Sequence, residues 1–144
     1  MENPFEYNFF RQELSQFAVL DESPDVLENG LGIENSFRFD CDRDHRVVKC
    51  TVSTLLKAQD RIVLKFNLEG YFRISSGSFE SIKKDGGIEL PVDILIQFTS
   101  LVYGSARGVL YAKSMGTPFE KVVLPPVYFN KVITAPARFE FGAE

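Results

Sequence analysis

The sequence has few of the residues on which metal binding, disulfide bonding and acid–base catalysis depend. It contains one histidine, two cysteines and no tryptophan. The cysteines, Cys41 and Cys50, do not have the spacing of zinc ligands and are too few for a disulfide framework. His45 lies between Asp44 and Arg46 with no evident nucleophile nearby, so we expect a solvated turn residue. We therefore expect buried, reduced thiols, no metal site and no cofactor.

Sequence motifs of catalysis are missing as well. The chain has no GxSxG or HExxH motif and no paired-carboxylate arrangement. The glycine-containing segment 104–108 (GSARG) is neither a Walker motif nor a dinucleotide motif, and it falls in the middle of a predicted helix. The sequence thus favours a protein that is not an enzyme.

The chain also lacks a strong excess of charge and a run that could span a membrane. Its net charge of −4 argues mildly against nucleic acid or an anionic membrane as a partner. The N-terminal segment has neither the basic nor the apolar part of a secretory signal. The longest apolar stretch is interrupted by Asp93, Gln97 and Arg107, which argues against membrane insertion. These features predict a soluble, cytoplasmic protein.

What the sequence does have is a large apolar and aromatic content. Apolar residues make up 44% of the 144 residues and charged residues 25%, which is typical of a globular domain. A chain of this length can bury a core, so we expect a single domain over residues 1–144. With 14 phenylalanines and 5 tyrosines, we expect some of the rings to lie on the surface.

Alternation of apolar and polar residues predicts an antiparallel sheet over residues 4–74. Three segments with a period of two are separated by short connections, and residues 4–20 supply a looser fourth strand. A bulge or bend is predicted where Phe9 and Phe10 break the pattern, and Gly70 indicates a close approach of the backbone. The predicted inward positions are Leu31, Ile33, Phe37, Phe39 and Cys41, then Val48, Cys50, Val52 and Thr54, and then Ile62, Leu64, Phe66, Leu68, Phe72 and Ile74.

Residues 91–115 are predicted to form one long helix that packs on this sheet, giving an α+β fold, with a loop over 75–90 before it. Pro91 suits the first turn, Asp93 complements the positive end of the helix dipole, and Gly116 suits the C-terminal cap. One apolar stripe of this helix would cover the sheet, and it is predicted to consist of Leu95, Phe98, Val102, Ala106, Val109 and Ala112 or Lys113.

Apolar residues on the other faces of the helix predict a second buried contact. The candidate residues for an oligomer interface are Leu101, Gly104, Gly108 and Tyr111. Gly104 and Gly108 are small residues four positions apart, and this spacing permits close approach of a second helix. The alternative is that these glycines only pack against the sheet.

An extended, proline-rich tail over residues 116–144 follows the helix. Its prolines, the last of which is Pro136, exclude a long closing helix. The alternating pair Phe139 and Phe141 predicts a short strand or a docking segment.

The aromatic residues provide the candidate binding residues. Phe9, Phe37, Phe39, Tyr71 and Phe79 are candidates for an exposed apolar groove that binds extended polypeptide. The alternative is that these rings only fill a core and a subunit interface. A third interpretation is a β-fold that binds a small molecule in a closed apolar cavity.

Several short motifs resemble the SecB family of protein-export chaperones. Ala106-Arg107 lies in the middle of the helix, as in that family. Gly116-Thr117 closes the helix and is followed by Pro118-Phe119, where the family tends to have Phe-Pro. The segment Leu124–Phe129 (LPPVYF) resembles the family's Leu-x-Pro-Val-x-Phe signature. Upstream, Glu69–Ile74 (EGYFRI) resembles the glycine-containing end of the family's fourth strand. The resemblance covers most of the chain.

The resemblance implies a SecB-like fold, in which a four-stranded antiparallel sheet is packed by the long helix, and a homotetramer made of two dimers. It further implies an ATP-independent chaperone, or holdase, without cofactor or enzymatic activity. Such a chaperone binds unfolded precursor polypeptides and holds them until the SecA motor takes them for protein export.

The chain departs from the family after Phe129. A typical member has a second helix there, which helps to line the groove and to contact SecA, whereas this chain continues as NKVITAPARFEFGAE. The departure removes a helix with which a typical member contacts SecA, and so it argues against handover of clients to SecA. It also fits an alternative function, a dedicated SecB-like subunit with one fixed client, such as the antitoxin in a toxin–antitoxin–chaperone system.

Overall fold

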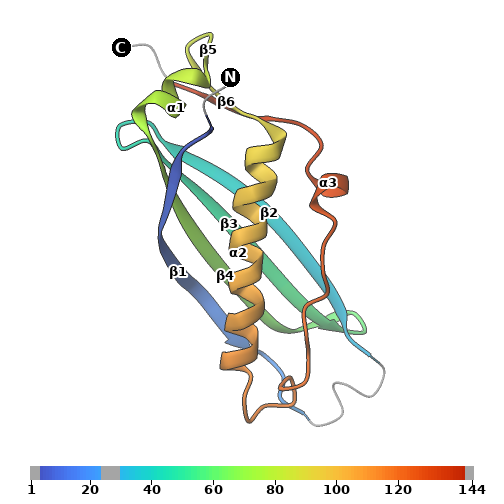
Figure 1. Cartoon of the computed structure of the whole chain (residues 1–144). Helices are drawn as coiled ribbons and strands as arrows, with labels where there is room; N and C mark the ends of the chain where they lie inside the picture. Colours follow the sequence, from blue (N-terminus) through green and yellow to red (C-terminus); the bar gives the residue numbers. More distant parts are fainter. Residues whose placement is uncertain (1–3, 24–29, 142–144) are drawn as a thin grey trace.

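A four-stranded antiparallel sheet carries one long helix, α2, across one of its faces (Figure 1). The computed structural model describes residues 4–23 and 30–141. Neighbouring strands are all antiparallel, in the order β1-β4-β3-β2, which confirms the predicted α+β class. The strands of this sheet are β1 (Tyr7–Val19), β2 (Gly32–Asp42), β3 (Val47–Ala58) and β4 (Arg61–Ile74).

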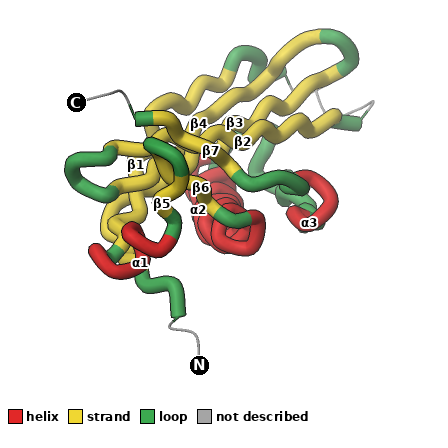
Figure 2. The backbone as a smooth tube through the Cα atoms, turned by 90° about the horizontal axis from the view of Figure 1, so that it is seen from above, coloured by secondary structure: helices red, strands yellow, loops and turns green. Residues whose placement is uncertain are grey.

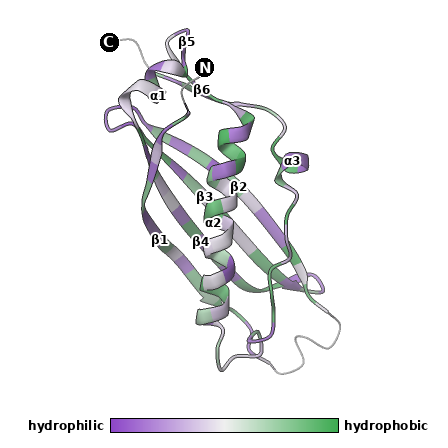
Figure 3. Ribbon diagram, in the orientation of Figure 1, coloured by the Kyte–Doolittle hydropathy of each residue, from purple (hydrophilic) through white to green (hydrophobic). Residues whose placement is uncertain are grey.

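The alternation in the sequence corresponds closely to the burial observed in β3. Every second residue of this strand is buried, beginning at Val48, and the residues between them are half-buried. The buried hydroxyl of Thr54 donates to Oδ1 of Asn35 at 2.7 Å, so its burial leaves no unpaired donor. The same alternation of hydrophobic and hydrophilic residues is visible along the strands in Figure 3.

One predicted inward position at the start of β4 is wrong. Ile62 is 37% exposed, whereas its neighbour Val63 is fully buried. The register between β3 and β4 shifts at Leu56 and Lys57, and this irregularity changes which residues of β4 face the core. Beyond it, from Leu64 onwards, the predicted inward positions of β4 are buried.

Two irregularities shape β1. The register with β4 shifts between Phe9 and Arg11, as predicted, and again between Leu14 and Gln16, which the sequence did not indicate. Because each extra residue reverses the alternation, apolar residues of both parities reach the same face. Tyr7, Phe9, Leu14, Phe17 and Val19 all pack against the core cluster between the sheet and α2.

Helix α2 (Val92–Lys113) is slightly shorter than the predicted range 91–115. Pro91 is the N-cap rather than a residue of the first turn, and Ser114 is the C-cap. Gly116 lies two residues further on, with φ of +79°, a left-handed conformation that suits glycine. In the stripe predicted to face the sheet, the residues up to Ala106 are buried and Val109 is half-buried against the core. The last predicted positions, Ala112 and Lys113, are exposed, and Leu110 is buried instead.

Gly70 allows the sheet and the helix to approach each other closely, as its place in the sequence indicated. A Cβ at this position would lie 2.4 Å from Cγ2 of Val102 and 3.2 Å from the ring of Phe9. Any larger residue would therefore have to push the helix or the β1 ring away.

The predicted loop over residues 75–90 contains regular structure instead. It forms α1 (Ser76–Ser81), β5 (Lys83–Lys84) and β6 (Gly87–Leu90). Strand β6 also pairs with β7 (Ala137–Glu140), so the order in this second sheet is β5-β6-β7. A short strand or docking segment was predicted at Phe139 and Phe141, but the partner strand, about 50 residues earlier, was not.

The tail between α2 and β7 runs back beside α2 on the side of β2 (Figures 1 and 2). Its only helix among the described residues is the four-residue α3 (Phe129–Val132), in agreement with the predicted lack of a long second helix. Phe119 and Leu124 are buried, so the tail is part of the domain rather than an appendage.

Candidate functional site

A row of half-buried apolar side chains follows β1, the strand at one edge of the sheet. We call this row the β1 strip, and its members are Tyr7, Phe9, Leu14, Phe17 and Val19. Helix α2 packs against β3 and β4, so β1 lies beside the helix rather than beneath it (Figure 2). The strip is therefore covered on one side only.

Tyr7 connects the β1 strip to α2. Its ring meets Phe98 edge-on, with centroids 4.8 Å apart, and its hydroxyl hydrogen-bonds Oε1 of Gln97 at 3.0 Å. Phe9 stacks on Phe72 with centroids 4.6 Å apart. These contacts hold the inner edge of the strip in place, while its side chains are only half-buried.

The backbone next to the β1 strip is also available. β1 pairs only with β4 among the described strands, so one side of its peptide groups has no strand partner there. An extended polypeptide can add to such an edge through main-chain hydrogen bonds. Side chains of that polypeptide that point to the helix side would then meet the apolar strip.

The opposite side of α2 is closed by the chain's own tail. The rings of Phe37, Tyr103 and Phe129 form a cluster with centroid separations of 5.5 to 6.4 Å. The Tyr103 hydroxyl donates to the carbonyl oxygen of Pro125 at 2.6 Å. Burial raises the pKa of Tyr103, which keeps this hydroxyl protonated as a donor. The SecB-like Leu124–Phe129 segment thus holds the tail against the helix.

The five aromatic residues predicted to bind a client do not share one surface. Phe9 belongs to the β1 strip, whereas Phe37 and Phe39 lie across the sheet on β2, where Phe37 contacts the tail residue Phe129. Tyr71 follows Gly70 and points to the face away from α2, as the alternation itself indicates. Phe79 is 4% exposed and stacks on Phe141, so it offers no free surface.

The residues predicted as an oligomer interface do share one surface. Leu101, Gly104, Gly108 and Tyr111 lie on the side of α2 that faces away from the sheet, and we call them the helix stripe. Leu101 is 44% and Tyr111 62% exposed. A Cβ at either glycine would meet no atom within 4 Å. The alternative that these glycines pack against the sheet is therefore wrong, while the interface itself stays a prediction.

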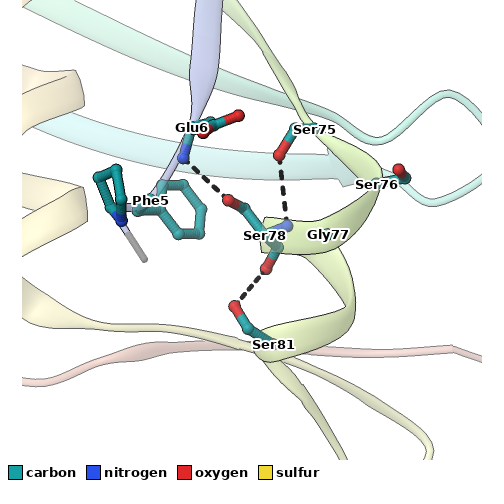
Figure 4. A pocket seen from close by; sticks show the side chains of 8 residues that line it. Phe5, Glu6, Ser75, Ser76, Gly77, Ser78 and Ser81 are labelled. Atoms are coloured by element: carbon teal, nitrogen blue, oxygen red, sulfur yellow. Dashed lines mark hydrogen bonds between the residues drawn. The ribbon is translucent and has the colours of Figure 1, made fainter. Parts of the chain in front are cut away.

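A serine-lined hollow of about 540 Å³ lies where α1 meets the start of β1 (Figure 4). Ser78 Oγ accepts from the backbone N–H of Glu6 at 2.8 Å, and Ser81 Oγ donates to the carbonyl oxygen of Ser78 at 2.6 Å. Ser75 Oγ accepts from the Ser78 N–H and caps the helix. These hydroxyls hold the local structure through their hydrogen bonds, and no histidine is among the described residues that line the hollow.

The remaining side chains that could react are two thiols with raised pKa values and one solvent-exposed histidine. Burial raises the pKa of Cys50 to about 12, and burial with the nearby Asp42 carboxylate raises that of Cys41 to about 11. His45 is an exposed turn residue, as predicted, and its Nδ1 lies 2.8 Å from Oδ2 of Asp42. Within residues 4–23 and 30–141, no group of three or more His, Cys, Asp or Glu could hold a metal ion.

Comparison with known proteins defines the fold class. No protein-family model matches the chain, and no curated protein sequence does. A solved structure that is similar is the SecB-like chaperone Rv1957 of Mycobacterium tuberculosis, in complex with a ChAD peptide from the antitoxin HigA1. The two structures agree with a TM-score of 0.50 and 15% identity, covering 84% of this chain and 90% of the other. The chain therefore has a SecB-like fold.

No helix in the described part of the chain is both long enough and apolar enough to cross a membrane.

Proposed function

We propose that this protein is a SecB-like, ATP-independent chaperone that binds unfolded or extended polypeptide along the β1 strip. The observation that supports this function most directly is the half-buried apolar row beside an unpaired strand edge. The SecB-like fold places the protein among architectures that include a peptide-binding chaperone. No nucleotide, metal or reactive residue is needed for such binding.

The chemistry of the β1 strip suits clients of varied sequence. Apolar contacts have no direction, and main-chain hydrogen bonds do not depend on the client's side chains. Completing the burial of a half-buried large side chain contributes roughly 1 kcal/mol, about half the value for full burial. Several such contacts would hold an unfolded client by mass action and keep it from aggregating.

Assembly through the helix stripe belongs to the same proposal. Leu101 and Tyr111 would be buried against a second subunit, and Gly104 and Gly108 would let the two helices come close. A dimer or a homotetramer in the cytoplasm is the expected form, with β1 strips of several subunits available to one long client.

A second candidate is a dedicated chaperone with one fixed client, such as an antitoxin. Two observations favour it over a general export chaperone that hands clients to SecA. The similar structure holds an antitoxin peptide. From Phe129 onwards, the described tail forms only the short helix α3, whereas a typical export chaperone is expected to have a longer second helix there.

The decisive experiment measures client binding by strip variants. The purified protein should suppress aggregation of a chemically unfolded client at stoichiometric amounts. Phe9→Ser and Leu14→Ser should each weaken suppression severalfold, because both remove apolar surface from the β1 strip. Val123→Ser is the matched control, since this residue is 68% exposed on the tail and outside the strip.

Unchanged suppression in both strip variants, with folding verified by thermal denaturation, would overturn the assignment of the β1 strip. No suppression by the wild-type protein, together with a monomeric mass in solution, would overturn the chaperone itself. Affinity capture from a lysate distinguishes the two candidates, because a general holdase should bring down many proteins and a dedicated chaperone a single stoichiometric one.

A further inference from the structure

The sheet face that α2 does not cover carries a hollow of about 480 Å³, which we call the Arg73 hollow. It is built from two adjacent rows of cross-strand neighbours near the β2–β3 turn. The pairing register defines these rows as Arg11, Tyr71, Lys49 and Asp40, and then Arg73, Val47 and Asp42, with Phe10 beside them. The hollow is thus formed by residues of all four strands of the main sheet.

The first bulge of β1 supplies the apolar wall of the Arg73 hollow. Phe10 lies at the register shift between Phe9 and Arg11, and the residue is 38% exposed. Its centroid lies 6.3 Å from that of Tyr71, with 54° between the planes. Two adjoining rings on this sheet face are unusual, because the face that alternates with the core face is generally polar.

An arginine side chain stacks on each ring of this wall. The guanidinium carbon of Arg73 lies 4.3 Å from the centroid of Phe10, and that of Arg11 lies 4.9 Å from the centroid of Tyr71. Stacking on an aromatic face holds a guanidinium in place while its N–H groups, which lie in its plane, can still donate. The N–H groups of Arg11 already donate to Glu13 at 2.7 Å.

The other charges at the Arg73 hollow are also matched within the protein. Asp40 accepts from Arg38 at 3.1 Å and lies 3.9 Å from Lys49. Asp42 binds the His45 ring, and this hydrogen bond lowers the pKa of the Asp42 carboxyl.

Tyr71 donates its hydroxyl to Glu69, which raises the pKa of Tyr71 to about 12. Among the described residues, the Arg73 guanidinium forms no ion pair with a carboxylate, and it stacks on the Phe10 ring. One preorganised cation therefore lies beside an apolar wall without an anionic partner in the described part of the chain.

We propose that the Arg73 hollow binds an acidic side chain of a partner polypeptide, with a neighbouring apolar residue of that partner against Phe10 and Tyr71. A carboxylate matches the planar N–H groups of Arg73 through two parallel hydrogen bonds. Asp40 and Asp42 at the rim disfavour a doubly charged phosphate more than a singly charged carboxylate. The site lies on the opposite face from the β1 strip and does not depend on the proposed function.

The test uses two matched peptides and nuclear magnetic resonance of the full chain. N-acetyl-phenylalanyl-glutamate amide should shift the backbone amide signals of Phe10, Tyr71 and Arg73 in a saturable manner. The glutamine counterpart has the same shape without the charge, and it should bind at least about tenfold more weakly, as expected for loss of a charge-assisted bidentate contact. Arg73→Gln should lower the affinity for the glutamate peptide to a similar extent.

Lys65→Gln is the control, because it removes one positive charge from the same strand and face outside the hollow. It should leave the affinity within about twofold, since its charge acts only at long range. Equal affinity for the two peptides would overturn the proposal, and so would equal affinity of the wild-type protein and Arg73→Gln for the glutamate peptide. Signal shifts confined to the β1 strip would also overturn it. Inorganic phosphate that shifts the same signals more strongly than the glutamate peptide would overturn the choice of a carboxylate.

Discussion

Phe72 of β4 and Phe98 of α2 stack face to face, with centroids 4.0 Å apart and planes 9° apart. Both rings are fully buried, and Tyr7 meets each of them edge-on. This stack joins the sheet to the helix and also supports the inner edge of the β1 strip. The stability of the fold and the shape of the candidate site therefore depend on the same aromatic contact.

Phe98→Ala should lower the free energy of unfolding by about 3–5 kcal/mol, because it leaves a cavity between α2 and the sheet. Urea denaturation followed by circular dichroism measures the change. Tyr111→Ala on the exposed side of the same helix should cost less than about 0.5 kcal/mol in the dissociated protein. Equal losses in the two variants would contradict the central role of the stack.

Gly70→Ala should destabilise the protein by about 1–3 kcal/mol, because its Cβ would lie 2.4 Å from Cγ2 of Val102. Val102→Ala removes that methyl group and should make the Gly70→Ala substitution less harmful. A double-mutant cycle measured by urea denaturation tests the coupling. Strictly additive losses would show that the overlap is relieved elsewhere.

Gly108→Leu should reduce the mass of the protein in solution to that of a smaller assembly, because it fills the space that the proposed helix contact requires. It should not destabilise the isolated subunit, since a Cβ at Gly108 meets no atom within 4 Å and glycine is a poor helix former. Sedimentation velocity and thermal unfolding measure the two effects separately. Gly77→Leu is the control, because Gly77 also has open space but lies outside α2.

Cys41 and Cys50 should react slowly with a thiol reagent at pH 8 in the folded protein and rapidly in urea. Their pKa values of about 11 and about 12 leave very little thiolate at that pH. Unfolding returns both groups to the ordinary pKa near 9.0, so the thiolate fraction and the rate increase. Stopped-flow absorbance measures the rates, and Cys41→Ser assigns them. Fast reaction of Cys50 in the native protein would contradict its burial.

Tyr103→Phe should loosen the tail without unfolding the domain. The substitution removes the 2.6 Å hydrogen bond to Pro125, which contributes about 1 kcal/mol. Hydrogen exchange of the Lys131 and Ile133 amides, which are bonded within α3, should become several times faster. Exchange of the β3 amides serves as the internal reference and should not change.

Much of the architecture follows from local sequence patterns. The alternation in β2, β3 and most of β4, the uninterrupted helical stretch and the prolines of the tail predicted the sheet, α2 and the absence of a long second helix. Local patterns succeed here because one face of each element is buried and the other is more accessible to solvent. The placement of Tyr71 away from the helix was already implied by its position next to Gly70.

The candidate surfaces, by contrast, required the tertiary structure. The second bulge of β1 brings Leu14 onto the same face as Phe17, and no local pattern indicated it. The pairing of β6 with β7 joins segments about 50 residues apart, and the buried Phe79 stacks on Phe141, which lies even further along the chain. The sequence by itself determined the four strands of the main sheet, helix α2 and an aromatic content too large for a simple core. Only the tertiary structure decided which of them share a surface, because that depends on register and long-range pairing rather than on local periodicity.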